Sequence, residues 1–108
     1  MRRRKFPVAS LVLSLGVWAA LAQQKGDVGR GKDVFEAQCF DCHNADSKEN
    51  KVGPGLKGVK DGKLPSGKET NHDNILDIVN KGTDIMPPFK EILNDQQKED
   101  VIVYVMSL

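Results

Sequence analysis

Two cysteines and a histidine lie close together in the sequence Cys39-Phe40-Asp41-Cys42-His43. Residues three apart share one face of a helix, so both thiols can face a single ligand, with the imidazole directly after them. Each thiol can add to one vinyl group of a haem, and a histidine can bind the haem iron. The spacing therefore predicts one covalently attached haem c, with Cys39 and Cys42 as its anchors and His43 as an iron ligand.

A Cys-x-x-Cys pair also occurs in redox dithiols, in disulfides and in halves of zinc sites. A structural zinc site usually has four ligands, but the chain has only these two cysteines and one further histidine, His72. A thioredoxin-like dithiol is expected at a helix start within a βαβ pattern, and no run of strands is predicted nearby. A disulfide would close a very short loop and would contribute little stabilisation. Haem attachment is the favoured interpretation.

The start of the 108-residue chain has the layout of a secretory signal peptide. Four basic residues, Arg2 to Lys5, precede an apolar run from Val8 to about Trp18, and Ala20-Leu21-Ala22 predicts cleavage directly after it. An uncleaved membrane anchor is the alternative, although the run is short for a span of about 20 apolar residues. We expect residues 1–22 to be a signal peptide and residues 23–108 to form one exported domain, in the periplasm or a similar compartment.

The charge balance changes if this leader is removed. It carries four of the sixteen basic residues and none of the fifteen acidic ones, which leaves a net charge of about −3. A mildly acidic chain does not favour nucleic acid as a partner. A domain this small buries little of its own surface, so a large apolar cofactor is a plausible centre for its core.

The segment from Asp27 to Gln38 predicts a helix that ends at the cysteine motif. Asp27 is a suitable N-cap residue, and Gly31, Phe35 and Cys39 recur every four residues on one face. A glycine within a helix costs up to about 1 kcal/mol relative to alanine. We therefore expect Gly31 to mark the close approach of another helix.

A second helix is predicted over residues 71–81, because apolar residues recur there at helical spacing between a capping Asn71 and Gly82. His72 lies at its start. A histidine in that position is expected to be exposed and without a role, although its imidazole is the main rival for the sixth iron position.

The last helix is predicted over residues 95–108. The β-branched run from Val101 to Val105 would by itself favour a strand. Asn94 and Gln97, however, have the spacing of a capping box, and the apolar residues that follow form a helical stripe. Helix is the preferred interpretation, with a strand as the alternative.

The segment 27–38, with its glycine, its phenylalanine and the cysteine motif, resembles the amino-terminal helix of the small monohaem class I cytochromes c. The resemblance extends from Asp27 to Leu108. It implies an all-α fold in which three to four short helices surround a covalently attached haem. It also implies that Gly31 and Phe35 pack against an aromatic residue of the last helix, which here would be Tyr104.

Residues 44–69 are rich in glycine, proline and lysine and predict a loop. Within it, Gly53-Pro54-Gly55-Leu56 resembles the family segment beneath the histidine side of the haem. The resemblance implies that the Pro54 carbonyl accepts a hydrogen bond from the His43 ring and that Leu56 packs on the porphyrin. Such an acceptor orients an imidazole ligand and raises its basicity. An ordinary Pro-Gly turn is the alternative.

The sixth iron ligand is expected to be Met86, which stands before Pro87 and Pro88. A residue before proline is driven to an extended conformation, and two prolines stiffen the chain that follows. A methionine-proline pair after a helix that ends in glycine also resembles the way the family presents its axial methionine. Met106 is a weaker candidate, because it is expected to pack in an apolar core.

With His43 and Met86 both on the iron, no position would be free for a substrate. This set of ligands predicts a single-electron carrier, not an enzyme, between a redox protein donor and an acceptor. We expect it to act as a monomer, without stable membrane insertion if the leader is cleaved and anchored to the membrane if it is not. Six lysines between residues 48 and 68 could steer an acidic partner, or could be a solvated face. The alternative functions are a haem enzyme or gas or peroxide sensor with an open sixth position, and a haem subunit of a larger oxidoreductase.

Overall fold

Four helical segments form the regular structure of residues 25–108, the part of the chain that this computed structural model describes. They are α2 (Val28–Gln38), the short 3-10 helix η1 (Val59–Asp61), α3 (His72–Lys81) and α4 (Asp95–Val105). A single β-bridge joins Lys63 and Glu69. The predicted signal peptide, residues 1–22, lies outside the described residues. None of the helices in the described part has the length and apolar character that crossing a membrane requires.

Each α-helix begins after a residue whose side chain accepts a hydrogen bond from the backbone N–H three residues further on. These N-cap residues are Asp27, Asn71 and Asn94, all at donor–acceptor distances of 2.8 Å. Asn94 also donates its own backbone N–H to the Gln97 side chain at 2.9 Å, which completes the predicted capping box. The expected helix starts are confirmed, and the β-branched run of α4 is helical because the cap and the packing of its apolar stripe override strand propensity.

The end of α4 differs from the prediction. The helix ends at Val105 and does not continue to Leu108. The Leu108 carbonyl instead accepts a hydrogen bond from the Gly58 N–H at 2.7 Å, so the last residues turn toward the loop that precedes η1. Met106, which was expected to pack in the core, is 38% exposed at the C-cap.

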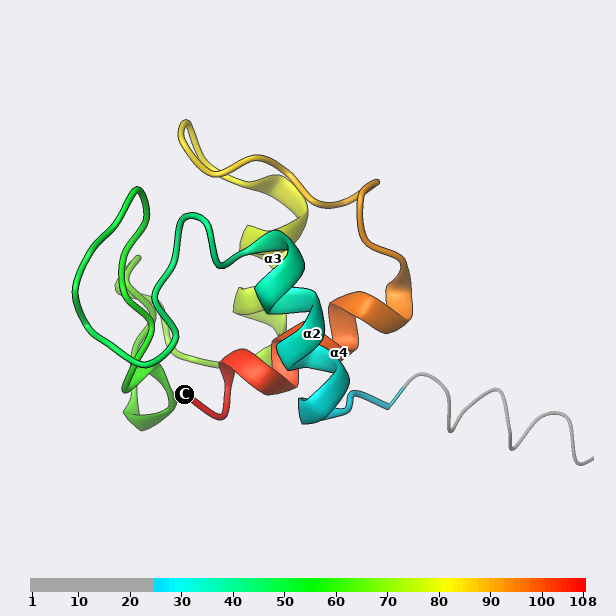
Figure 1. Ribbon diagram of the computed structural model, residues 1–108, viewed down its shortest axis with the longest axis horizontal. Coiled ribbons are helices and arrows are strands. Elements are labelled where there is room, and N and C mark those ends of the chain that lie inside the picture. Colours follow the sequence, from blue (N-terminus) through cyan, green and yellow to red (C-terminus); the bar gives the residue numbers. More distant parts are fainter. Residues whose placement is uncertain (1–24) are drawn as a thin grey trace, which may run out of the picture.

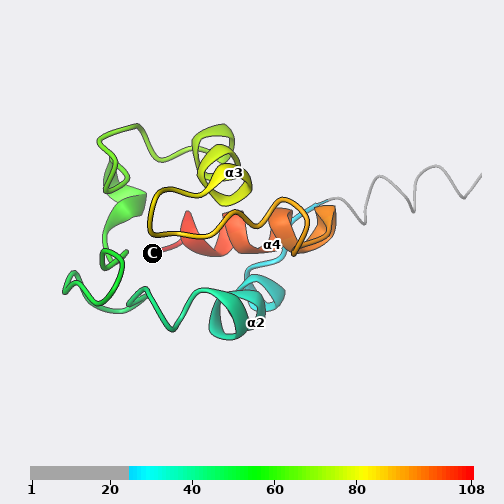
Figure 2. The same cartoon turned by 90° about the horizontal axis from the view of Figure 1, so that it is seen from above.

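Helix α4 lies between α2 and α3, with the loop after α2 at one side of the helices and the loop after α3 crossing the molecule to the start of α4 (Figures 1 and 2). α2 packs against α4 at Gly31, where an added Cβ would lie 2.7 Å from Tyr104 Cβ. The rings of Phe35 and Tyr104 meet edge to face, with centroids 5.3 Å apart and an interplanar angle of 85°. The predicted close approach and the predicted aromatic pair are both confirmed.

A buried carboxylate adds a polar tie between α2 and α4. Asp100 is 2% exposed and accepts hydrogen bonds from Arg30 Nε at 3.0 Å, the Asp27 N–H at 2.9 Å and the Gln96 amide at 3.0 Å. Burial alone would raise the pKa of Asp100, but these donors and the Arg30 charge outweigh burial and hold it below its usual value. The first turn of α2 is thereby fixed to the middle of α4.

Candidate functional site

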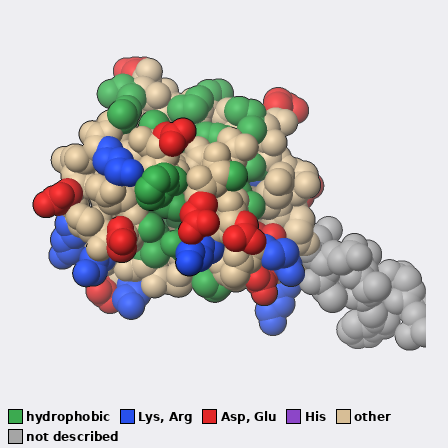
Figure 3. Space-filling model, in the orientation of Figure 1, with side chains coloured by type: hydrophobic (Ala, Val, Ile, Leu, Met, Phe, Trp, Pro, Cys, Tyr) green, Lys and Arg blue, Asp and Glu red, His purple; other side chains and the backbone are tan. Residues whose placement is uncertain are grey.

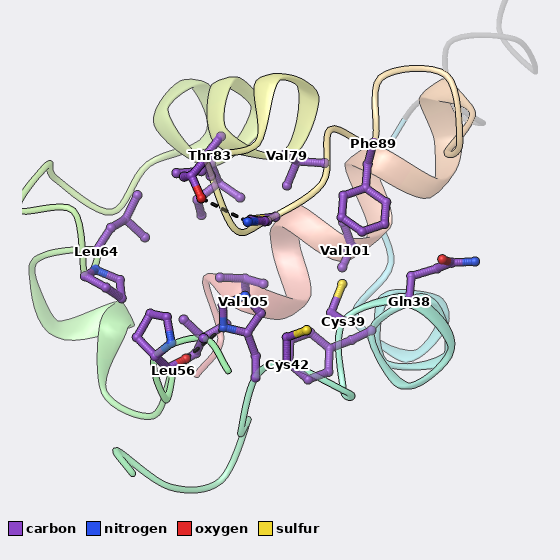
Figure 4. Close-up of a pocket in the computed structure, with 18 of the residues that line it drawn as sticks. Gln38, Cys39, Cys42, Leu56, Leu64, Val79, Thr83, Phe89, Val101 and Val105 are labelled. Atoms are coloured by element: carbon purple, nitrogen blue, oxygen red, sulfur yellow. Dashed lines mark hydrogen bonds between the residues drawn. The ribbon is translucent and has the colours of Figure 1, made fainter. Parts of the chain in front are cut away.

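A cavity of about 390 Å³ lies among the three α-helices and the two long loops (Figure 4). Apolar side chains from all of these elements line it, with Phe35, Val79 and Val101 among them. All six residues that the sequence predicted for haem binding line this one cavity; they are Cys39, Cys42, His43, Pro54, Leu56 and Met86. A largely apolar pocket with a few polar groups converging on it is typical of a cofactor site.

The cysteines reach the cavity because α2 ends at the motif. Cys39 is the C-cap of α2, and the backbone N–H groups of Cys42 and His43 both donate to its carbonyl, at 3.2 and 3.0 Å. Both thiols are free, and their sulfur atoms lie at one side of the cavity in Figure 4. Burial, and then the neighbouring Cys42 thiol, raise the pKa of Cys39 to about 11. Redox dithiols depend on a lowered thiol pKa, so this environment does not suit a redox dithiol.

The His43 ring is oriented by the loop that follows it. Nδ1 lies 2.8 Å from the Pro54 carbonyl. Because a carbonyl only accepts, Nδ1 carries the proton, and Nε2 is the nitrogen with a free lone pair for a metal. The hydrogen bond that the resemblance implied is thus present. The Gly53 N–H also donates to the Cys42 carbonyl at 2.7 Å, which fastens this loop to the motif.

Two contacts at the motif were not foreseen from the sequence. Lys51 donates to the Phe40 carbonyl at 3.1 Å, and its ammonium lies 4.0 Å from the centroid of the Phe40 ring. Gly53 passes so close to His43 that an added Cβ would lie 2.7 Å from the ring atom Cε1. Lys51 is one of six lysines in this loop, and Gly53 is one of two glycines beside Pro54. Nothing in the sequence marks either residue as a contact of the cysteine motif.

Met86 is half-buried on the loop after α3. That loop folds back on the helix end because Gly82 adopts a φ of 63°, and an added Cβ there would lie 2.8 Å from backbone atoms of Pro87 and Pro88. The side chain of Thr83 faces the same cavity, with its hydroxyl hydrogen-bonded within the loop (Figure 4). The sequence analysis missed Thr83, whose role depends on the path of the loop.

His72, the rival imidazole, is not among the residues that line the cavity. Its Nδ1 lies 2.9 Å from the carboxylate of Asp73, and its Nε2 lies 2.8 Å from that of Glu99 on α4. These hydrogen bonds, Asp73 first and then Glu99, raise the pKa of His72. The structure therefore keeps this partly exposed histidine away from the proposed iron site, as expected, and shows an unexpected role for its imidazole, which links α3 to α4.

The cavity fits a haem by the chemistry of its donors. Two free thiols lie at one side, a histidine presents Nε2, a methionine lines the same space, and the remaining wall is largely apolar. Within residues 25–108, no group of three or more His, Cys, Asp and Glu side chains is placed to hold a metal ion. The zinc alternative therefore has no complete ligand set in this part of the chain.

Comparisons with known proteins agree with a cytochrome c fold that carries one haem. The family described as "Cytochrome C oxidase, cbb3-type, subunit III" matches residues 26–105. The chain is 34% identical to cytochrome c6 of Rippkaea orientalis over 82 residues, 76% of this chain and 71% of that protein. It is 31% identical to a cytochrome c-553-like protein of Synechocystis over 102 residues, 94% of this chain and 80% of the other. The solved structure of cytochrome c6 from the diatom Phaeodactylum tricornutum matches with a TM-score of 0.62 and 30% identity, over 76% of this chain and 93% of that one.

Proposed function

This chain belongs to the small monohaem class I cytochromes c, and we propose that it carries single electrons through one bound haem. One covalent haem c is the cofactor. Cys39 and Cys42 hold it through thioethers, and His43 and Met86 bind its iron. The observation that carries this assignment is the single apolar cavity that both cysteines, the histidine and the methionine line.

The chain keeps the iron site closed. Bound haem supplies a one-electron change at iron, and an axial methionine raises its reduction potential relative to other ligands. The Pro54 carbonyl, 2.8 Å from Nδ1, fixes the orientation of the His43 imidazole. Buried side chains such as Leu56 and Phe89 give the cavity an apolar lining. With two protein ligands on the iron, no position remains for a substrate, which supports a carrier and not an enzyme.

Redox partners would meet the protein at the mouth of the cavity. Val52 and Ile85 both line the cavity and are 64% and 74% exposed. Figure 3 shows hydrophobic side chains gathered along the edge where the loop after α3 runs. An exposed apolar rim of this kind suits transient contact with another protein. We place this monomeric carrier in the periplasm or another exported compartment.

The substitution Met86→Ala tests the ligand assignment. It should leave haem attached but open the sixth position, so that the ferrous protein binds carbon monoxide. The reduction potential should fall by on the order of 100 mV, within the range of about 0.8 V that axial ligands span. Met106→Ala is the control, because Met106 is exposed at the end of α4 and does not line the cavity. An unchanged potential in Met86→Ala would remove Met86 from the site.

Mass spectrometry of the exported wild-type protein tests the carrier function itself. Free thiols and no added haem mass would exclude it.

A haem subunit of a larger oxidoreductase is the second candidate. The matching family is described as an oxidase subunit, and the chain is 31% identical to the cytochrome bc1 complex cytochrome c subunit of Mycobacterium tuberculosis, although it covers only 30% of that protein. Purification of the untagged protein separates the two candidates. Persistent co-elution with one complex would favour the subunit, and elution of the protein alone would favour the free carrier.

A further inference from the structure

The side chain of Thr83 holds the backbone of Met86. Thr83 Oγ1 accepts a hydrogen bond from the Met86 N–H at 3.0 Å and a second from the Ile85 N–H at 3.2 Å. In return, the Thr83 N–H donates to the Met86 carbonyl at 2.8 Å. Across residues 25–108, no other side chain forms a hydrogen bond to the backbone of residues 83–88. The Thr83 hydroxyl therefore closes the turn on which Met86 stands.

Both ends of this turn are anchored to α3, but its middle is not. At one end, the left-handed Gly82 brings the returning chain against the helix end. At the other, the Phe89 N–H donates to the Val79 carbonyl at 2.8 Å, and the Phe89 ring is buried in the core. Between these anchors Asp84 is exposed and Ile85 is 74% exposed, so core packing does not fix them. Met86 itself is half-buried against the core, and the hydrogen bonds to the Thr83 hydroxyl add the side-chain contacts that hold its backbone.

We propose that Thr83 is a positioning residue for the sixth iron ligand. Its hydroxyl stabilises the closed turn in which Met86 lines the cavity, and it needs no contact with the haem. This inference rests on the proposed function, in which Met86 binds iron. A closed turn and an open turn are two states in equilibrium, and an external ligand can bind the iron only when Met86 has left. The apparent affinity of an external ligand therefore reports the population of the open turn.

The test is a titration of the ferric, haem-loaded protein with imidazole. Thr83→Val keeps the shape of the side chain but removes the acceptor of two backbone N–H groups. It should raise the apparent imidazole affinity about tenfold, equivalent to about 1.4 kcal/mol. Each of the two lost hydrogen bonds makes only a modest net contribution to the stability of the closed turn. Thr83→Ser keeps the hydroxyl and should behave as wild type. Thr70→Val is the matched control, because the Thr70 hydroxyl donates to the Val59 carbonyl at 2.5 Å, outside the Met86 turn.

Two results would overturn the inference while leaving the proposed function intact. One is an imidazole affinity of Thr83→Val within about twofold of wild type, while Met86→Ala binds imidazole far more tightly. The other is an equal gain of affinity in Thr83→Ser and Thr83→Val, which would exclude the hydroxyl. If Met86→Ala and wild type bind imidazole alike, the ligand assignment itself fails, and the role of Thr83 fails with it.

Amide hydrogen exchange in the wild-type protein provides a measurement that needs no variant. The Met86 and Ile85 amides should exchange more slowly than the Asp84 amide, for which the structure shows no hydrogen bond. Equal and fast exchange at all three amides would contradict a turn that the Thr83 hydroxyl holds closed.

Discussion

Backbone atoms orient the His43 imidazole from two directions. The Pro54 carbonyl accepts a hydrogen bond from His43 Nδ1–H at an N–O distance of 2.8 Å, and Gly53 passes beside the ring with no space for a side chain. An added Cβ on Gly53 would also lie 3.0 Å from Nδ1 and 3.2 Å from the Cys42 carbonyl oxygen. Contacts this short require the ring, the loop or both to move. The orientation of the proposed iron ligand thus depends on the absence of one methyl group.

Gly53→Ala should therefore affect both stability and potential. Overpacking of this kind typically costs about 1–3 kcal/mol in the free energy of unfolding. Displacement of the loop weakens the hydrogen bond from His43 to Pro54, and a less basic imidazole stabilises ferric iron less. The potential should rise by about 20–40 mV, which corresponds to about 0.5–1 kcal/mol for a one-electron couple. Protein-film voltammetry and denaturant unfolding would measure the two effects.

Gly62→Ala is the control for this substitution, because an added Cβ at Gly62 would meet no atom within 4 Å. It should leave the potential at the wild-type value. A Gly53→Ala protein with wild-type potential and stability would show that the loop absorbs the methyl group without moving His43.

At the scale of the elements, His72 joins the start of α3 to the middle of α4. Its imidazole lies between the carboxylates of Asp73 and Glu99, at 2.9 and 2.8 Å. Both partners favour the imidazolium, so the pKa of His72 is raised in the folded protein. Below the unfolded value of about 6.5, the imidazole is charged in both states and the ion pairs contribute fully. Their contribution is lost as the pH rises through the higher folded pKa.

We therefore expect the free energy of unfolding to decrease when the pH is raised from about 6 to about 8.5. The His72 side chain is 43% exposed, so solvent screening limits the change to less than about 1 kcal/mol. Glu99→Gln removes the charge on α4 and should reduce this decrease, and His72→Gln should remove it. The measurement is urea unfolding of the haem-loaded proteins at both pH values. If wild type and both variants lose stability in parallel, the decrease comes from another group.

The helices could be predicted because their signals are local. Asp27, Asn71 and Asn94 each satisfy a backbone donor three residues away, so the sequence alone locates the helix starts. The haem motif could be predicted for the same reason, because Cys39, Cys42 and His43 lie within five residues of one another. The contacts of Gly53 and Thr83 depend on the paths of loops, which residue spacing does not determine. The end of α4 could not be predicted from local sequence either. The Leu108 carbonyl accepts a hydrogen bond from the Gly58 N–H, fifty residues earlier in the sequence.

At the scale of the whole molecule, three lysines lie together beside the haem cavity. On the face shown in Figure 3, acidic and basic side chains are interspersed. A shallow, more polar surface pocket shares Pro54, Leu64 and Pro65 with the haem cavity. Three of its lining residues are lysines; these are Lys48, Lys57 and Lys63. Positive charge is therefore gathered next to the proposed haem site in a chain whose mature form should be mildly acidic.

This placement predicts that the lysines guide anions to the haem. In the variant that combines Lys57→Gln with Lys63→Gln, oxidation of the reduced protein by ferricyanide should be about three- to tenfold slower at low ionic strength. The difference should vanish near 1 M salt, where the Debye length is about 3 Å. Lys32→Gln is the control, because Lys32 lies on α2 and pairs with Glu36 at 3.8 Å. The measurement is the stopped-flow rate of oxidation over a series of salt concentrations. A wild-type rate that does not change with ionic strength would exclude steering by these lysines.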